Sequence, residues 1–200
     1  MLRFTLPLLV ALAACAPTPP EAPPAPETAA LYPNETPALR ALVNKWAAIY
    51  DVPASLLHRV LQRESDYRPG ARNGPYWGMM QILPATARGV NFQGDPAQLL
   101  DAETHLKYAT RYLRGAWMLS DGDEQAAMMW YARGYYYEAK RKGLLYETGL
   151  QGDMWGKVDR GEGAMVPIDA AGNPLPPEAQ EPACERASGF AGLVGAKTCS

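Results

Sequence analysis

Apolar residues recur at the spacing of an α-helix through the middle of the chain. In the first such segment, residues three and four positions apart form one apolar face, made of Leu39, Leu42, Val43, Trp46 and Ile49. The same spacing, with capping residues and prolines, predicts helices that begin near Thr36, Pro53, Pro84, Asp101, Asp123 and Tyr135. No run of alternating residues predicts a large sheet. We therefore expect an all-α, mainly helical fold over about residues 31–148.

The N-terminal segment has the composition of an export signal. Arg3 supplies a positive charge, and an apolar run of 11 residues follows from Phe4 to Ala14. This run is too short to span a bilayer, which takes about 20 residues, but it matches the apolar region of a secretory signal. Residues 1–14 are therefore predicted to be a signal peptide.

The apolar run ends in Leu12-Ala13-Ala14-Cys15, which resembles a bacterial lipobox. In that resemblance, Cys15 becomes the first mature residue and carries the acyl chains. The alternative is an ordinary signal peptide in which this cysteine falls by chance. Residues 16–27 hold six prolines, which favour an extended backbone, so residues 15–30 are predicted to be a Pro/Ala-rich tether.

The C-terminal part, residues 149–200, shifts to a Gly-, Pro- and Ala-rich composition and is predicted to be an irregular tail. If Cys15 is lipidated, Cys184 and Cys199 are the two cysteines that remain. Export would place them in an oxidising compartment, where a disulfide is the expected outcome. The alternative, a reactive thiol or a metal site, lacks a nearby histidine.

The overall charge excludes some classes of partner. The chain has 19 Lys and Arg against 21 Asp and Glu, a net charge of −2, whereas a nucleic-acid-binding protein needs a concentrated basic surface. His58 and His105 are far apart, and no metal-ligand spacing, phosphate loop or dinucleotide fingerprint is present. We therefore expect no nucleic-acid partner, no metal and no cofactor.

Glu64 is the candidate for acid–base chemistry. It follows Leu57 and Leu61 at helical spacing, so its carboxyl group lies on the buried face of the second predicted helix. Burial disfavours the ionised form and raises the pKa of a carboxyl group. A carboxyl group that stays protonated near neutral pH can protonate the leaving oxygen of a glycosidic bond. The alternative is a glutamate at a helix end that simply pairs with Arg63 or Arg68.

Three motifs, in order, resemble those of the soluble lytic transglycosylase domain family. The first is similar to the family's E-S-x-aromatic-x-P and consists of Glu64-Ser65, Tyr67 and Pro69. The second is similar to G-L-M-Q-I-x-P-x-T-A and consists of Gly78-Met79-Met80-Gln81-Ile82, Pro84, Thr86 and Ala87. The third stands where the family carries A-Y-N-x-G and consists of Trp130-Tyr131-Ala132-Arg133-Gly134. The resemblance covers about residues 40–143.

The chain departs from the family pattern at several positions. Asn73 stands where the family usually has a serine, and Pro75-Tyr76-Trp77 replaces a Gly-Ala pair before the second motif. In the third motif, Ala132 replaces an asparagine, which removes an amide that would bond to substrate or to the wall of the site. Tyr131, which in the family helps to hold the catalytic glutamate, is retained.

The resemblance implies a lysozyme-like α domain in which Glu64 stands at a helix end and faces a groove. The implied partners are peptidoglycan glycan strands, cleaved between N-acetylmuramic acid and N-acetylglucosamine without water. The glutamate acts first as an acid on the leaving oxygen. It then acts as a base on the muramic 6-hydroxyl, which closes a 1,6-anhydro ring, so the second carboxylate of most glycoside hydrolases is not needed.

Two other functions stay open on the sequence alone. A muramidase with the same fold would hydrolyse the same bond and would need a second carboxylate, such as Glu138. A non-catalytic cell-wall-binding lipoprotein would have lost its activity together with the asparagine that Ala132 replaces.

Aromatic residues gather around the motifs, and sugars present C–H faces that pack on aromatic rings. Tyr76 and Trp77 fall in a loop between two motifs, where contact with a glycan is favoured over core packing. With the motif residues, the set expected to bind substrate is Ser65, Asn73, Tyr76, Trp77, Met80, Gln81, Tyr131 and Tyr135. We expect a periplasmic protein with its lipid anchor in the outer membrane, because Ala16 is not the aspartate that often marks inner-membrane retention.

Overall fold

The computed structural model describes residues 30–169 and 172–175. The predicted signal peptide (1–14), the lipidation site at Cys15 and its tether up to residue 29 lie outside these residues. The predicted disulfide between Cys184 and Cys199 lies outside them too. These four remain predictions from the sequence.

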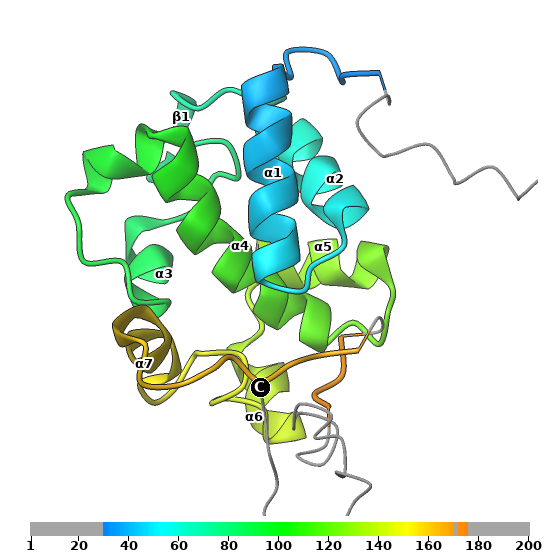
Figure 1. Ribbon diagram of the computed structural model, residues 1–200, viewed down its shortest axis with the longest axis vertical. Helices are drawn as coiled ribbons and strands as arrows, with labels where there is room; N and C mark the ends of the chain where they lie inside the picture. The colour runs from blue at the N-terminus through cyan, green and yellow to red at the C-terminus, as the bar shows by residue number, and fades with distance from the viewer. Residues whose placement is uncertain (1–29, 170–171, 176–200) are drawn as a thin grey trace, which may run out of the picture. The chain divides into compact units, whose positions relative to one another are not determined.

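The described part of the chain is built from helices, which confirms the predicted all-α fold (Figure 1). The helices are α1 (Pro37–Ile49), α2 (Ala54–Glu64), α3 (Pro84–Gly89), α4 (Ala102–Met118), α5 (Glu124–Arg133), α6 (Tyr136–Lys142) and α7 (Met154–Arg160). A 3₁₀ helix, η2, covers Pro96–Leu100, and a two-stranded antiparallel hairpin joins β1 (Arg72–Asn73) to β2 (Tyr76–Trp77). None of the described helices combines the length and the apolar character needed to cross a membrane.

Polar caps fix where the main helices begin. The side chain of Thr36 accepts a hydrogen bond from the backbone N–H of Leu39 at 3.2 Å. Asp101 accepts one from the N–H of Thr104 at 2.8 Å in the same way. Each bond satisfies a backbone donor that has no partner inside the helix. These local signals explain why α1 and α4 begin where the sequence predicts.

Helix α4 is the central element of the core. It packs against α1, α5, α3 and η2, and in Figure 1 it lies beside α1 and reaches toward α5. Its buried apolar residues are Leu106, Ala109, Leu113, Ala116, Trp117 and Met118. The predicted apolar face of α1 holds at Leu39, Val43 and Trp46, but its last member, Ile49, is exposed because the helix ends there.

The first part of the predicted irregular tail is ordered in one short helix, α7. Trp155 is buried, and its ring meets that of Tyr50 edge to face at 5.5 Å. The Nη1 atom of Arg111 in α4 donates to Asp159 in α7 at 3.0 Å. Both partners of α7 lie far away in sequence, so the composition of residues 149–200 could not reveal this contact.

Candidate active site

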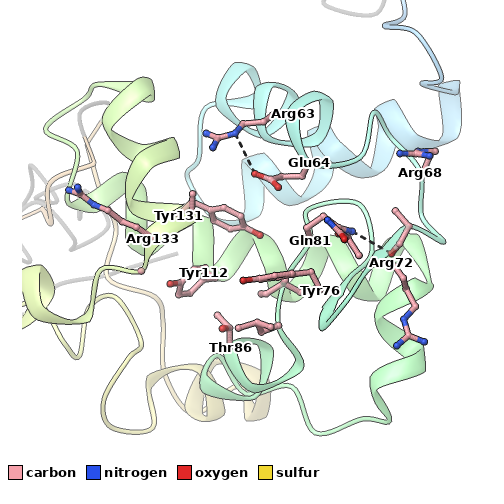
Figure 2. Close-up of a pocket in the computed structure, with 16 residues that line it drawn as sticks. Arg63, Glu64, Arg68, Arg72, Tyr76, Gln81, Thr86, Tyr112, Tyr131 and Arg133 are labelled. Carbon is pink, nitrogen blue, oxygen red and sulfur yellow. Dashed lines mark hydrogen bonds and ion pairs between the residues drawn. The ribbon is translucent and has the colours of Figure 1, made fainter.

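A groove of about 810 Å³ opens where α2 ends, and Figure 2 draws the side chains that line it. Its walls come from the end of α2, the β1–β2 hairpin, the start of α3, the middle of α4 and the end of α5. We call it the α2 groove and define it by its lining residues: Arg63, Glu64, Arg68, Ala71, Arg72, Asn73, Tyr76, Gln81, Ile82, Leu83, Thr86, Tyr112, Tyr131, Ala132, Arg133 and Gly134.

Glu64 is the last residue of α2, and its side chain is 23% exposed toward the groove. Burial raises the pKa of Glu64, and the nearby Arg63 opposes part of this rise. The Nε atom of Arg63 lies 3.7 Å from a Glu64 carboxylate oxygen, beyond hydrogen-bonding distance. The raised pKa is the direction that the helical spacing predicts. Glu64 is also the only carboxylate among the described residues of the groove.

The turn after Glu64 is held from several sides. Asp66 and Tyr67 both have positive φ angles, 53° and 59°, which are unfavourable for residues with a Cβ atom. The Ser65 hydroxyl donates to the carbonyl of Met79 at 2.8 Å, and the Asn34 amide donates to Asp66 at 2.5 Å. Such a turn persists because its surroundings hold it, so the chain leaves α2 at a fixed angle beside the carboxyl group of Glu64.

A buried polar group, the Glu35 cluster, fixes Tyr67 in this turn. We define it as Glu35, Arg40, His58 and Tyr67. The Tyr67 hydroxyl lies 2.7 Å from Nδ1 of His58, and that nitrogen lies 3.7 Å from Glu35. Arg40 binds both carboxylate oxygens of Glu35, with its Nε at 2.6 Å and its Nη2 at 2.5 Å. The cluster therefore ties the segment before α1 to α2 and to the turn behind the groove.

The second motif, residues 78–82, crosses the floor of the groove over His105. The backbone N–H of Met80 donates to Nε2 of His105 at 2.9 Å, and Nδ1 lies 2.9 Å from the carbonyl of Leu99. Only the neutral tautomer with its proton on Nδ1 satisfies both contacts. Complete burial lowers the pKa of His105 to about 4, which keeps it neutral. A Cβ at Gly78 would stand 2.2 Å from Nδ1, so this position requires glycine.

The third motif brings Tyr131 to the same segment. Its hydroxyl donates to the carbonyl of Met80 at 2.9 Å, and not to Glu64. Burial raises the pKa of Tyr131 well above its usual value, and the proximity of Glu64 raises it further. Tyr131 therefore keeps its proton and joins α5 to the floor of the groove beside the carboxyl group.

The predicted substrate-binding residues divide into two groups of equal size. Those that line the groove are Asn73, Tyr76, Gln81 and Tyr131. The others, which are not among the lining residues, are Ser65, Trp77, Met80 and Tyr135. Met80 and Tyr135 are almost completely buried, and the hydroxyl of Tyr135 donates to the carbonyl of Tyr112 at 2.8 Å.

Several groove residues were missed by the sequence interpretation. They are the arginines Arg63, Arg68, Arg72 and Arg133, together with Tyr112 and Thr86. Arg68, Thr86 and Arg133 fall inside or beside the motifs, so the motifs could have indicated them. Tyr112 lies in the middle of α4, where only the packing of α4 against α5 brings it to the groove.

Two further residues from the sequence predictions, Ala132 and Glu138, lie inside and outside the groove. Ala132 is exposed and lines the groove, so the amide that it replaces would have faced the substrate. Glu138, proposed as a second carboxylate, lies in α6 outside the lining of the groove. It accepts hydrogen bonds from Nε and Nη2 of Arg141 at 2.8 and 2.5 Å. In the described part of the chain, no group of three or more His, Cys, Asp or Glu residues could hold a metal ion.

A comparison with known protein families agrees with this geometry. The family model for the transglycosylase SLT domain matches residues 41–148, which is more than half of the chain and includes every residue that lines the groove. No solved structure matches the chain. On the family match, the chain belongs to the transglycosylase SLT domain family.

Proposed function

We propose that this protein is a lytic transglycosylase that cleaves the β-1,4 bond between N-acetylmuramic acid and N-acetylglucosamine. The observation that carries the proposal is Glu64, a partly buried carboxyl group with a raised pKa that faces the groove and forms no hydrogen bond with a carboxylate or cation of the described residues. The family match supports a transglycosylase-type cell-wall enzyme at the level of the family. The bond, the products and the role of each residue are our proposal.

In the first step, protonated Glu64 donates its proton to the glycosidic oxygen. The bond between this oxygen and C1 of the muramic residue breaks, and the N-acetylglucosamine end leaves with a hydroxyl group. The carbonyl oxygen of the muramic N-acetyl group stabilises the positive charge at C1. The raised pKa of Glu64 favours the protonated acid that this step needs.

In the second step, ionised Glu64 accepts the proton of the muramic 6-hydroxyl. The oxygen of this hydroxyl bonds to C1 and closes the 1,6-anhydro ring, and the glutamate regains the proton that it gave up. No water enters, and one carboxylate serves both steps. A groove in which Glu64 is the only carboxylate among the described lining residues fits this scheme better than a two-carboxylate hydrolysis.

Mass spectrometry of the products from purified peptidoglycan tests the proposal directly. We expect soluble muropeptides whose muramic ends are lighter by one water than hydrolysed ends. Hydrated ends would instead support a muramidase, and an absence of soluble products would support a binding protein.

Glu138 provides a matched control for the role of Glu64. The Glu138→Gln variant should release the same anhydro products at close to the wild-type rate, because Glu138 is bound to Arg141 outside the groove. A large loss of activity in this variant would instead support hydrolysis by two carboxylates.

We propose further that Cys15 carries a lipid anchor that holds the enzyme in the periplasm at the outer membrane. A Cys15→Ser form should leave the detergent phase in which the wild type partitions, because the sulfur is the acylation site. Partitioning of both forms, followed by immunoblotting, is the measurement. A serine form that stays with the detergent would overturn the anchor.

A further inference from the structure

Two arginines of the α2 groove, Arg72 and Arg133, differ from most arginines elsewhere in the described structure in what they contact. Away from the groove, five arginines bind carboxylates: Arg40 with Glu35, Arg59 with Glu124, Arg111 with Asp159, Arg141 with Glu138 and Arg160 with Asp153. Arg114 is an exception that binds backbone carbonyls, and within the groove Arg63 lies 3.7 Å from Glu64. The groove holds four arginines and, among its described lining residues, one carboxylate. Its lining therefore carries an excess of positive charge, although the whole chain has a net charge of −2.

Two of these arginines are held on tryptophan rings. The guanidinium carbon of Arg72 lies 3.6 Å from the ring centroid of Trp77, and that of Arg133 lies 4.1 Å from the ring centroid of Trp130. No ion pair with a carboxylate of the described residues is formed by Arg72 or Arg133. Stacking restrains a guanidinium group and leaves its N–H donors free at the edge, where they can bind an anion.

Arg72 and Arg133 stand at opposite sides of Glu64. Arg72 comes from the hairpin and Arg133 from the end of α5, and Figure 2 shows Glu64 between them. A glycan strand that passes Glu64 therefore meets an arginine before and after the cleaved bond. Muramic residues recur at every second sugar, so a strand presents the groups attached to muramic acid on both sides of that bond.

We propose that Arg72 and Arg133 bind the carboxylates of stem peptides on the muramic residues that flank the cleaved bond. The inference rests on the proposed function and names its substrate class: glycan strands that still carry their peptides. N-acetylglucosamine has no charge, so free guanidinium groups have no ionic partner on it. Stem peptides bring several carboxylates, and guanidinium groups bind carboxylates through paired hydrogen bonds.

The test measures binding without turnover, so its outcome does not depend on the reaction proposed above. In a Glu64→Gln background, the protein is sedimented with three substrates: native peptidoglycan, peptidoglycan whose carboxylates have been amidated with a carbodiimide and ammonia, and strands freed of peptides by an amidase. Amidation removes the charge and keeps the peptide. The amidase removes the peptide and leaves one lactyl carboxylate on each muramic residue.

Native peptidoglycan should bind about three- to tenfold more tightly than either treated substrate, the range expected for two partly exposed ion pairs. The Arg72→Gln/Arg133→Gln variant should lose this preference, and the Arg72→Lys/Arg133→Lys variant should regain most of it. The matched control Arg141→Gln/Arg160→Gln removes two exposed arginines outside the groove and should keep the preference. Thermal melts establish that each variant is folded.

Three results would overturn the inference. One is equal binding of native and amidated peptidoglycan. Another is a preference that survives in the Arg72→Gln/Arg133→Gln variant. The third is unchanged affinity for strands freed of peptides, which would assign the arginines to the lactyl carboxylate of muramic acid. Because product analysis is a separate measurement, a failure here leaves the proposed reaction standing, and a failure there leaves this binding result intact.

Discussion

Two glutamates near the turn after α2 have opposite electrostatic properties. Glu35 is completely covered, yet its pKa is lowered: burial alone would raise it, but hydrogen bonds from Arg40 and from the backbone N–H of Tyr32 reverse the effect. The side chain of Glu64 is 23% exposed and its pKa is raised, because burial acts there and is opposed only by the charge of Arg63. The exposed area of the side chain alone therefore does not decide which carboxyl group is ready to donate a proton. The number of donors that face it does.

The difference divides the two residues by role. Glu35 is ionised in the folded protein and holds Arg40 and the loop before α1, which makes it a structural group. The carboxyl oxygens of Glu64 face the groove without a hydrogen-bond partner among the described residues, and its protonated form is favoured by its surroundings. Substitution of Glu64 should therefore change the activity, whereas substitution of Glu35 should change the stability of the fold.

The largest effect is expected from Glu64→Gln on the release of muropeptides from peptidoglycan. The amide can neither donate the first proton nor accept the second, and each such role contributes about 10²–10⁴-fold to the rate. We expect a loss of at least that size while the melting temperature stays close to that of the wild type. A folded variant that remains within a few-fold of the wild-type rate would disprove the role of Glu64.

The Glu35→Gln variant should show the reverse pattern, a loss of stability of about 2–3 kcal/mol, because it removes the buried charge that binds both Nε and Nη2 of Arg40. Urea denaturation at neutral pH measures this loss. Since the pKa of Glu35 is lowered in the folded state, the stability difference should be present above its ordinary value of 4.5 and disappear as the pH falls through the folded value. A variant as stable as the wild type at neutral pH would contradict the structural role of Glu35.

A smaller effect is expected from Arg63→Gln on the pH dependence of activity. The charge of Arg63 lowers the pKa of Glu64, so its removal should move the alkaline limb of the kcat/KM profile upward. The shift should be small, because Arg63 and Glu64 form a partly exposed ion pair. Arg59→Gln, on the same helix but outside the groove, is the control. A shift of equal size in both variants, or a downward shift, would argue against this contact.

The smallest effect concerns the stability of Glu64→Gln as a function of pH. A raised pKa means that the folded protein binds the proton of Glu64 more tightly than the unfolded chain does. The wild type should therefore lose stability relative to the variant as the pH rises from 4.5 through the folded value. Melts of both proteins at pH 4 and pH 7 measure this difference. If the variant instead loses stability relative to the wild type at the higher pH, the pKa of Glu64 is not raised.

Much of the fold follows from local signals that the sequence displays. Thr36 and Asp101 cap their helices through hydrogen bonds that reach only three residues, so α1 and α4 begin where the pattern predicts. The position of Glu64 on the buried face of α2 also follows from spacing within one helix. The turn after it does not, because the positive φ angles of Asp66 and Tyr67 depend on partners such as Asn34 and His58, from other elements.

The sequence by itself determined the helical class, the main helix boundaries and the identity of the carboxyl group at the end of α2. Only the tertiary structure decided that α7 joins the core through Asp159, and that His105 supports Met80 at the floor of the groove. It also decided which arginines have carboxylate partners and which, like Arg72, are stacked beside the groove without one in the described structure. The physical reason is the distance along the chain over which each kind of interaction acts. Caps and helical periods act over a few residues, whereas burial, ion pairing and the pKa of a carboxyl group depend on neighbours that the folded chain brings together from distant positions.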